Sequence, residues 1–211
     1  MSSTEKLIAN LAQDAIPVKP APHPFLLGAK WLAWVVVYLA LSLAFSGLRP
    51  DLMTQLQSPL FVIELVLLAA IIISTLFSAA LLAFPDMHQK RRVAYAPIWM
   101  MALFILVMIL SWRANIHPSH LSGHSVKCLI VIASLTLLPA AWIFYAMRKL
   151  ASTHPYLAGS IALLSAFSIG ALSLRLSEQT DSILHVMQWH YLPMIGVGIL
   201  GLVLGRLLLK W

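Results

Sequence analysis

Six long apolar runs follow one another along the chain and are separated by short polar segments. They cover roughly residues 25–48, 60–84, 97–112, 126–147, 156–174 and 186–209. A helix needs about 20 predominantly apolar residues to cross the hydrocarbon core of a bilayer. The pattern therefore predicts an all-α, polytopic membrane protein with six transmembrane helices, in which the short connections make consecutive helices antiparallel neighbours.

The segment before the first run has a different periodicity. Leu7, Ile8, Leu11 and Ala15 stand at i, i+1, i+4 and i+8, which places them on one stripe of a helix over residues 1–16. Such a short amphipathic helix is marginal alone in water, so its stripe needs a partner. A protein groove, the membrane surface and the loops of the chain itself are the alternatives.

Prolines at 17, 20, 22 and 24 end this helix and predict an extended, stiff spacer leading to the membrane. The predicted organisation is a cytoplasmic N-terminal segment of residues 1–24 and a six-helix transmembrane domain of residues 25–211.

Composition supports the membrane interpretation and excludes two other classes. Hydrophobic residues make up 61% of the chain and charged residues only 10%, with a mean hydropathy of +0.89. An ordinary globular domain is about 45–50% apolar and about 25% charged. A soluble single domain and a disordered chain are therefore both excluded.

The charge distribution predicts the orientation. The net charge of +7 comes from basic residues in short flanks between apolar runs, which is typical of topology signals and not of a nucleic-acid surface. We expect no direct contact with nucleic acid. Ten basic residues lie on one side, namely Lys6, Lys19, Lys30, Lys90, Arg91, Arg92, Arg148, Lys149, Arg206 and Lys210. Four lie on the other, namely Arg49, Arg113, Lys127 and Arg175. The bias predicts that both termini are cytoplasmic, and the apolar spans are expected to contact membrane lipid.

Small residues recur in the apolar runs, and Gly201 and Gly205 form a GxxxG pair. This spacing allows two helices to approach closely. Packing within the chain is the favoured interpretation, and a homodimer contact is the alternative.

Glu64 is an acidic residue inside an apolar run, and such a charge is by default a functional candidate. It lies close enough to the end of its run to reach the interface or to pair with Arg49, Arg113 or Arg175. A structural ion pair is favoured over a proton or cation site, because the runs hold few other charges. A small transporter, or a metal-responsive transporter subunit, is the alternative function; it is motivated by Glu64 together with the histidines on the side opposite the termini.

Histidines gather on the side opposite the termini, around the single cysteine. The candidate signal-sensing residues are Cys128, His117, His120, His124 and His190, with His185 close to the last of these. Imidazole and thiolate groups are ligands for zinc or copper. Pro118 and Gly123 interrupt the helical face of the first three histidines, so the sequence indicates no resident metal or cofactor. Interfacial polarity alone is the simpler explanation for Trp189 and His190.

Catalytic motifs are missing from the sequence. It has no G-x-S-x-G motif, no paired catalytic carboxylates and no phosphate-binding glycine loop. We therefore expect a protein that is not an enzyme.

Several short motifs, in this order, carry a resemblance to a known family. They are EKLIANLAQDAIPVKP (5–20), GLRPDL (47–52), SPLFVIEL (58–65), LLPAAW (137–142), WHYLP (189–193) and GRLLLKW (205–211). With the six-span frame, they resemble the NrsF-type negative regulators of sigma-F-like ECF sigma factors over essentially the whole chain.

The resemblance implies an anti-sigma factor of the bacterial inner membrane. Its N-terminal segment, around Leu7, Ile8 and Leu11, would bind an ECF sigma factor and keep it from RNA polymerase. Family members are similar in carrying two periplasmic cysteines linked to heavy-metal stress. Cys128 matches the first cysteine, but Leu176 and Ser177 stand where the second would fall. This departure argues against a dithiol switch and leaves a histidine-assisted metal site or another signal in its place.

Overall fold

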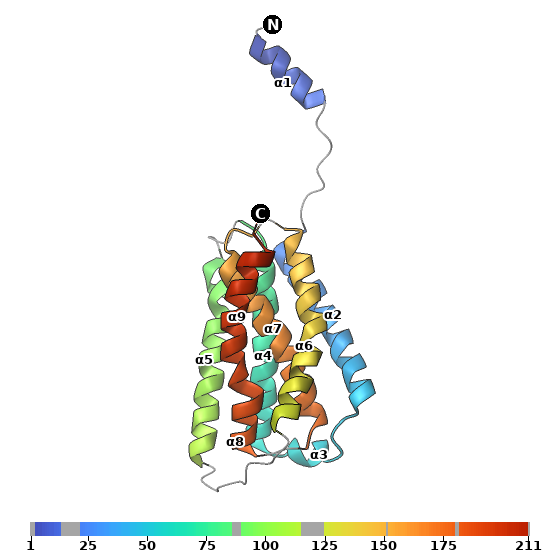
Figure 1. The fold of residues 1–211 in the computed structure, drawn as a ribbon, viewed down its shortest axis with the longest axis vertical. Coiled ribbons are helices and arrows are strands. Elements are labelled where there is room, and N and C mark those ends of the chain that lie inside the picture. The colour runs from blue at the N-terminus through green and yellow to red at the C-terminus, as the bar shows by residue number, and fades with distance from the viewer. Residues whose placement is uncertain are drawn as a thin grey trace.

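The computed structural model describes residues 3–13, 22–85, 90–114, 125–150, 152–179 and 182–210, and within these ranges every regular element is a helix (Figure 1). The elements are α1 (Ser3–Gln13), α2 (Pro24–Ser46), α3 (Leu52–Gln55), α4 (Pro59–Leu82), α5 (Arg91–Ala114), α6 (Ser125–Arg148), α7 (Pro155–Ser177), α8 (Ile183–His185), the π-helix η2 (Val186–Tyr191) and α9 (Pro193–Leu208). The all-α prediction is confirmed.

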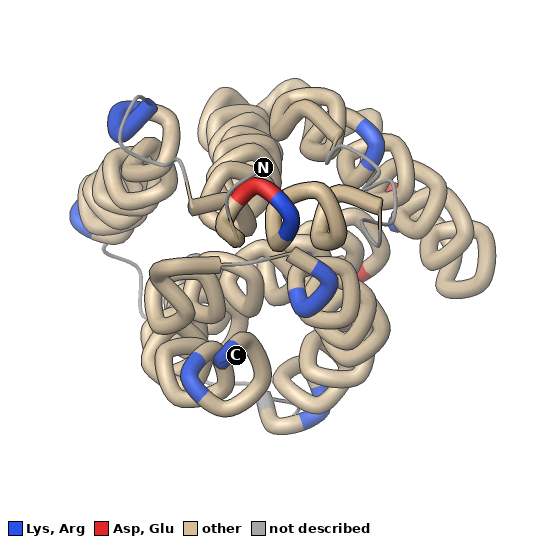
Figure 2. The backbone as a smooth tube through the Cα atoms, turned by 90° about the horizontal axis from the view of Figure 1, so that it is seen from above, with Lys and Arg blue, Asp and Glu red and all other residues tan. Residues whose placement is uncertain are grey.

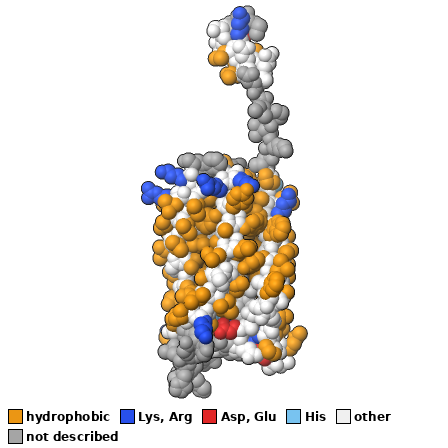
Figure 3. Space-filling view, turned by 45° about the vertical axis from the view of Figure 1, so that its right-hand side comes forward, with side chains coloured by type: hydrophobic (Ala, Val, Ile, Leu, Met, Phe, Trp, Pro, Cys, Tyr) orange, Lys and Arg blue, Asp and Glu red, His pale blue; other side chains and the backbone are white. Residues whose placement is uncertain are grey.

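Six of these segments are long and apolar enough to cross a membrane: α2, α4, α5, α6, α7, and η2 together with α9. They run antiparallel in chain order (Figure 1). Their outer surface is covered by hydrophobic side chains (Figure 3), the reverse of a soluble protein. The chain is a multi-pass membrane protein.

The third span differs from the prediction at its start. The helix begins at Arg91 and not at Pro97, which lies inside it. Proline loses one backbone hydrogen bond, and a membrane helix tolerates it when neighbouring helices support the backbone. Ser78 of α4 donates to the carbonyl of Ala94, in the turn before the proline, at 2.6 Å.

Pro139, inside α6, is accommodated by a hydrogen bond from another span. Pro139 has no N–H to donate to the carbonyl four residues earlier, which belongs to Leu135. The hydroxyl of Tyr38 in α2 donates to that carbonyl at 2.7 Å. A side chain from another span therefore replaces the missing backbone bond.

The central helix of the bundle is α7, which packs against α9, α6, α4 and α2. Its closest approach is to α9. A Cβ atom on Gly201 would lie 2.6 Å from Cα of Ser160, and one on Gly205 would meet the carbonyl oxygen of Pro155 and the backbone of Gly159. The GxxxG pair thus serves a contact within the chain.

The two ends of the bundle carry different charges. We call them the C-terminal end, where α2 begins and α9 ends, and the α3 end, where α3 and α8 lie (Figure 1). Basic side chains line the rim of the C-terminal end, as Figure 3 shows from the side, and Figure 2 views this end from above. By element, the described basic residues at this end are Lys30, Lys90, Arg91, Arg92, Arg148, Lys149, Arg206 and Lys210. Those at the α3 end are Arg49, Arg113, Lys127 and Arg175.

Helix α1 stands apart from the bundle (Figure 1), and none of its residues is buried. The predicted helix over residues 1–16 is thus described over Ser3–Gln13. Ala15 and the spacer up to residue 21 lie outside the described residues.

Candidate functional site

Among the described residues, the buried charged and histidine side chains of the bundle lie at the α3 end. Glu64, in the second turn of α4, is buried and accepts two hydrogen bonds from Arg175 at the end of α7. Nε of Arg175 lies 2.8 Å from Oε1 of Glu64, and Nη2 lies 3.2 Å from Oε2. This is the paired arrangement in which an arginine best neutralises a carboxylate. Of the candidate partners of Glu64, the structure thus shows Arg175 bonded to it.

A third element joins this pair. The hydroxyl of Tyr191, in η2, donates to Oε1 of Glu64. The Tyr191 ring meets the ring of Phe104 in α5 edge-on, with centroids 4.7 Å apart. The carboxylate of Glu64 therefore connects α4, α7 and η2 through charged and hydroxyl donors.

A second ion pair, between Arg49 and Asp51, lies beside this network in the segment before α3. Arg49 is buried and donates to both carboxylate oxygens of Asp51, at 2.9 and 2.7 Å. Hydrogen bonding to this guanidinium lowers the pKa of Asp51 to about 2. The guanidinium carbons of Arg49 and Arg175 lie 5.4 and 4.7 Å from the ring centroid of Phe61, at distances typical of cation–π contacts.

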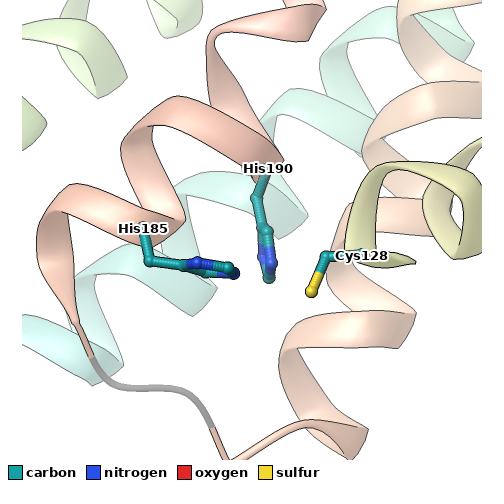
Figure 4. Close-up of side chains that lie close together, drawn as sticks. All are labelled: Cys128, His185 and His190. Atoms are coloured by element: carbon teal, nitrogen blue, oxygen red, sulfur yellow. The ribbon is translucent and has the colours of Figure 1, made fainter. Parts of the chain in front are cut away.

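Beside this network lies a second group formed by Cys128, Glu178, His185 and His190. Sγ of Cys128 donates to Oε1 of Glu178 at 3.1 Å, and Nε2 of His190 lies 3.5 Å from Oε2 of the same carboxylate. The ligand atoms of Cys128, His185 and His190 all lie within 4.8 Å of one another. Figure 4 shows both imidazole rings turned toward the thiol.

The π-helix is what brings the two histidines together. In an α-helix, residues five apart point about 140° away from each other. In η2 the turns are wider, as the i→i+5 bond from the N–H of Leu192 to the carbonyl of Met187 shows. Pro193 follows Leu192 and begins α9, and it has no N–H to continue an α-helical hydrogen-bond pattern from η2. His185 and His190 consequently face the same side.

The histidines are buried without hydrogen-bond partners. His185 is 2% exposed and His190 is 1% exposed, and all four ring nitrogens lack a hydrogen bond among the described residues. A buried polar group without a partner costs about 1–3 kcal/mol. Such groups are rare in native proteins and call for an explanation such as a bound ion.

The predicted sensing residues divide into two sets. Cys128 and His190 lie together, whereas His117, His120 and His124 lie outside the described residues. His185 joins the first set, and so does Glu178, which the sequence reasoning missed. The only sequence signal for Glu178 is its position directly after the fifth apolar run, on the same side as Cys128.

The predicted partner-binding stripe is open. Leu7, Ile8 and Leu11 are 59%, 62% and 63% exposed, and they lie within about 100° of arc on α1. The described part of the chain offers this apolar face no cover.

Comparison with known families decides the class of the protein. The family described as NrsF, negative regulator of sigma F, matches residues 11–211. The chain belongs to this family. No curated protein and no solved structure matches it. Membership in NrsF makes the chain a negative regulator whose partner is a sigma factor, and it places the chain in a regulatory family. Leu11 falls inside the matched range, and Leu7 and Ile8 precede it.

Proposed function

We propose that this protein is an inner-membrane anti-sigma factor. It holds an ECF sigma factor through α1 on the cytoplasmic side and releases it when a signal, such as heavy-metal or oxidative stress, reaches the opposite end of the bundle. Lipid surrounds the spans.

The observation that carries the proposal is the exposed stripe of Leu7, Ile8 and Leu11. An amphipathic helix that lays such a stripe in an apolar groove is a common form of protein recognition. Lys6 is the single basic residue in α1, so the helix has little charge to hold it on an anionic bilayer. A protein groove is therefore the favoured partner.

The charge of the bundle supports the orientation. Eight described basic residues lie at the C-terminal end and four at the α3 end, and the more basic side of a membrane protein is cytoplasmic as a rule. With α1 at the C-terminal end, a cytoplasmic sigma factor meets the stripe directly.

The transport alternative loses one of its two supports, the charge of Glu64. Glu64 is bonded to Arg175 and Tyr191, so its charge is already neutralised by a neighbour. A carboxylate held in this way serves packing at the α3 end and not the passage of an ion.

Titration of the full-length protein in nanodiscs with an ECF sigma factor from the same cell tests the proposal. Burying a leucine side chain contributes about 1.5–3 kcal/mol. Leu7→Ala and Leu11→Ala should each weaken sigma binding about tenfold or more, because every 1.4 kcal/mol corresponds to a factor of ten.

Gln13→Ala is the matched control, because Gln13 is exposed on the opposite face of α1. We expect it to bind as the unchanged protein does. Equal affinity of all three variants would overturn the assignment of the stripe as the sigma-binding surface.

A further inference from the structure

Cys128, His185 and His190 form a three-ligand constellation that the sigma-binding proposal does not use. We propose that they bind a divalent transition-metal ion of the zinc class at the α3 end of the bundle, with Glu178 beside them. The inference deepens the proposed function, because it names the ligand on the signal side. Only its last step, the effect on sigma binding, rests on that function.

The donor set suits such an ion. One thiolate and two imidazoles with a nearby carboxylate are typical ligands of Zn²⁺ and of ions with similar preferences. The thiolate of Cys128 and the carboxylate of Glu178 together balance two positive charges, which matters at a site with little water. Calcium and magnesium prefer oxygen ligands and fit poorly.

The distances indicate an open site that closes on the ion. Ligand atoms around a tetrahedral zinc lie roughly 3.4–3.8 Å apart, given bonds of about 2.0–2.3 Å. Those of Cys128, His185 and His190 lie within 4.8 Å of one another. Side-chain rotation and a small approach of α6 toward η2 complete the coordination.

The unpartnered imidazoles point independently to a ligand. Both rings are at least nine-tenths buried, none of their nitrogens has a hydrogen bond among the described residues, and both turn toward the thiol (Figure 4). A metal ion gives one nitrogen of each ring a bond that no described residue provides as a hydrogen bond, since Oε2 of Glu178 approaches Nε2 of His190 only to 3.5 Å. Glu178 is 25% exposed and gives the site contact with the outside.

Binding requires loss of the thiol proton, and the structure provides an acceptor. Sγ of Cys128 donates to Oε1 of Glu178. When the sulfur bonds to the metal, its proton passes to Glu178 and from this partly exposed carboxylate to the outer solvent. One proton leaves for each ion bound, and no oxidant or reductant is needed.

The ligands come from two separate spans, which couples binding to helix packing. Cys128 belongs to α6, whereas His185 and His190 belong to α8 and η2. Tyr191, the neighbour of His190, is bonded to Glu64 in α4. An ion that draws α6 toward η2 therefore acts on the same segment that the Glu64 network holds.

Metal titration of the full-length protein in nanodiscs tests the site. Zn²⁺ binding is followed by calorimetry, and Co²⁺ serves as a spectroscopic probe. Cys128 is the single cysteine of the chain. A thiolate-to-cobalt charge-transfer band in the unchanged protein consequently identifies Cys128 as a ligand without any substitution. We expect this band at one equivalent of Co²⁺ and its loss when Zn²⁺ is added.

Substitutions assign the other ligands. Cys128→Ser, His185→Gln and His190→Gln should each weaken Zn²⁺ binding more than about 100-fold, and Glu178→Gln about 10–100-fold, the range of effects that residues next to a metal ligand show. His23→Gln, at the C-terminal end, is the matched control and should bind as the unchanged protein does. Absence of the cobalt–thiolate band in the unchanged, folded protein overturns the proposal.

A second set of histidines makes the assignment specific. The combined change of His117, His120 and His124 to Gln should leave the cobalt band and the Zn²⁺ affinity in place. Loss of binding in that variant, with binding kept in His185→Gln and His190→Gln, would assign the site to the other three histidines and refute the present ligand set.

The link to function is measured separately, by sigma binding with and without Zn²⁺. We expect the ion to weaken sigma binding at least tenfold in the unchanged protein and to have no effect in His190→Gln. Zn²⁺ binding without an effect on sigma keeps the metal site and refutes its role in release. Failure of sigma to bind at all refutes the proposed function and leaves the metal result standing.

Discussion

The central helix α7 is joined to the last span, formed by η2 and α9, by two different kinds of contact. Near the C-terminal end, α7 meets α9 backbone to backbone through Gly159, Gly201 and Gly205. Near the α3 end, Arg175 of α7 reaches η2 through Glu64 and Tyr191. The glycine contact is set by the close approach of two backbones, whereas the charged contact is made by side chains of three elements. The two contacts should therefore respond to different substitutions.

Breaking the charged contact should have the largest effect. Arg175→Met leaves the buried Glu64 without its guanidinium partner, and loss of one member of a buried pair costs about 3–5 kcal/mol. The free energy of unfolding in mixed micelles measures the cost. Arg113→Met, on the exposed face of α5, is the control and should change it little. A double variant with Glu64→Gln should recover part of the loss.

A variant that lacks only the hydroxyl of Tyr191 tests one hydrogen bond of the same contact. Tyr191→Phe keeps the ring against Phe104 but deletes the hydrogen bond to Glu64. A hydrogen bond to a charged group contributes about 1.5–3 kcal/mol, so unfolding should become easier by that amount. Tyr156→Phe, at an exposed tyrosine in α7, should leave stability unchanged. Equal stability of Tyr191→Phe would show that Arg175 alone holds the carboxylate.

The glycine contact is tested by adding one carbon atom. Gly205→Ala places a Cβ against the carbonyl of Pro155 and should cost about 1–3 kcal/mol as the helices move apart. Gly196→Ala, where a Cβ meets nothing within 4 Å, is the matched control. If both variants unfold alike, the close approach of α7 and α9 is not a determinant of stability.

The smallest effect should be at Asp51, whose carboxylate lies at the edge of the charged end. Its native pKa of about 2 is below the ordinary value of 3.8, so the ionised form stabilises the fold above about pH 4. This contribution falls as the pH decreases toward 2. Asp51→Asn should therefore lower the unfolding midpoint slightly at pH 7, and the difference from the unchanged protein should disappear near pH 2. A difference that persists at pH 2 would assign it to packing and not to charge.

The six spans could be predicted because hydrophobicity over about 20 residues is a local property. Pro97 misled the prediction of one boundary, since the turn before it packs against another span, where Ala94 is buried and accepts a hydrogen bond from Ser78. The short helix α3 and the π-helix have no strong local signal. Glu64 was identifiable as a buried charge, but the choice of Arg175 as its bonded partner depends on how α4 and α7 pack.

The candidate metal site shows the same division. The sequence identified Cys128 and His190 as candidate sensing residues on one side of the membrane, with His185 close to His190 along the chain. Their meeting with Glu178 depends on the wide turns of η2 and on the packing of α6 beside it. Residues five apart would face different ways in an ordinary helix, so no helical periodicity connects the two histidines.

By itself the sequence determined the number of spans, the bias of basic residues to one side, the amphipathic stripe of α1 and the glycine pair of the last span. These features follow from hydrophobicity, charge and spacing, which act over one or two helical turns or along a single span. Tertiary structure alone decided which charge meets which, what Gly205 packs against and which ligands face Cys128. Those choices join residues up to 127 positions apart, as Tyr191 and Glu64 are, and only the packing of the spans brings such residues into contact.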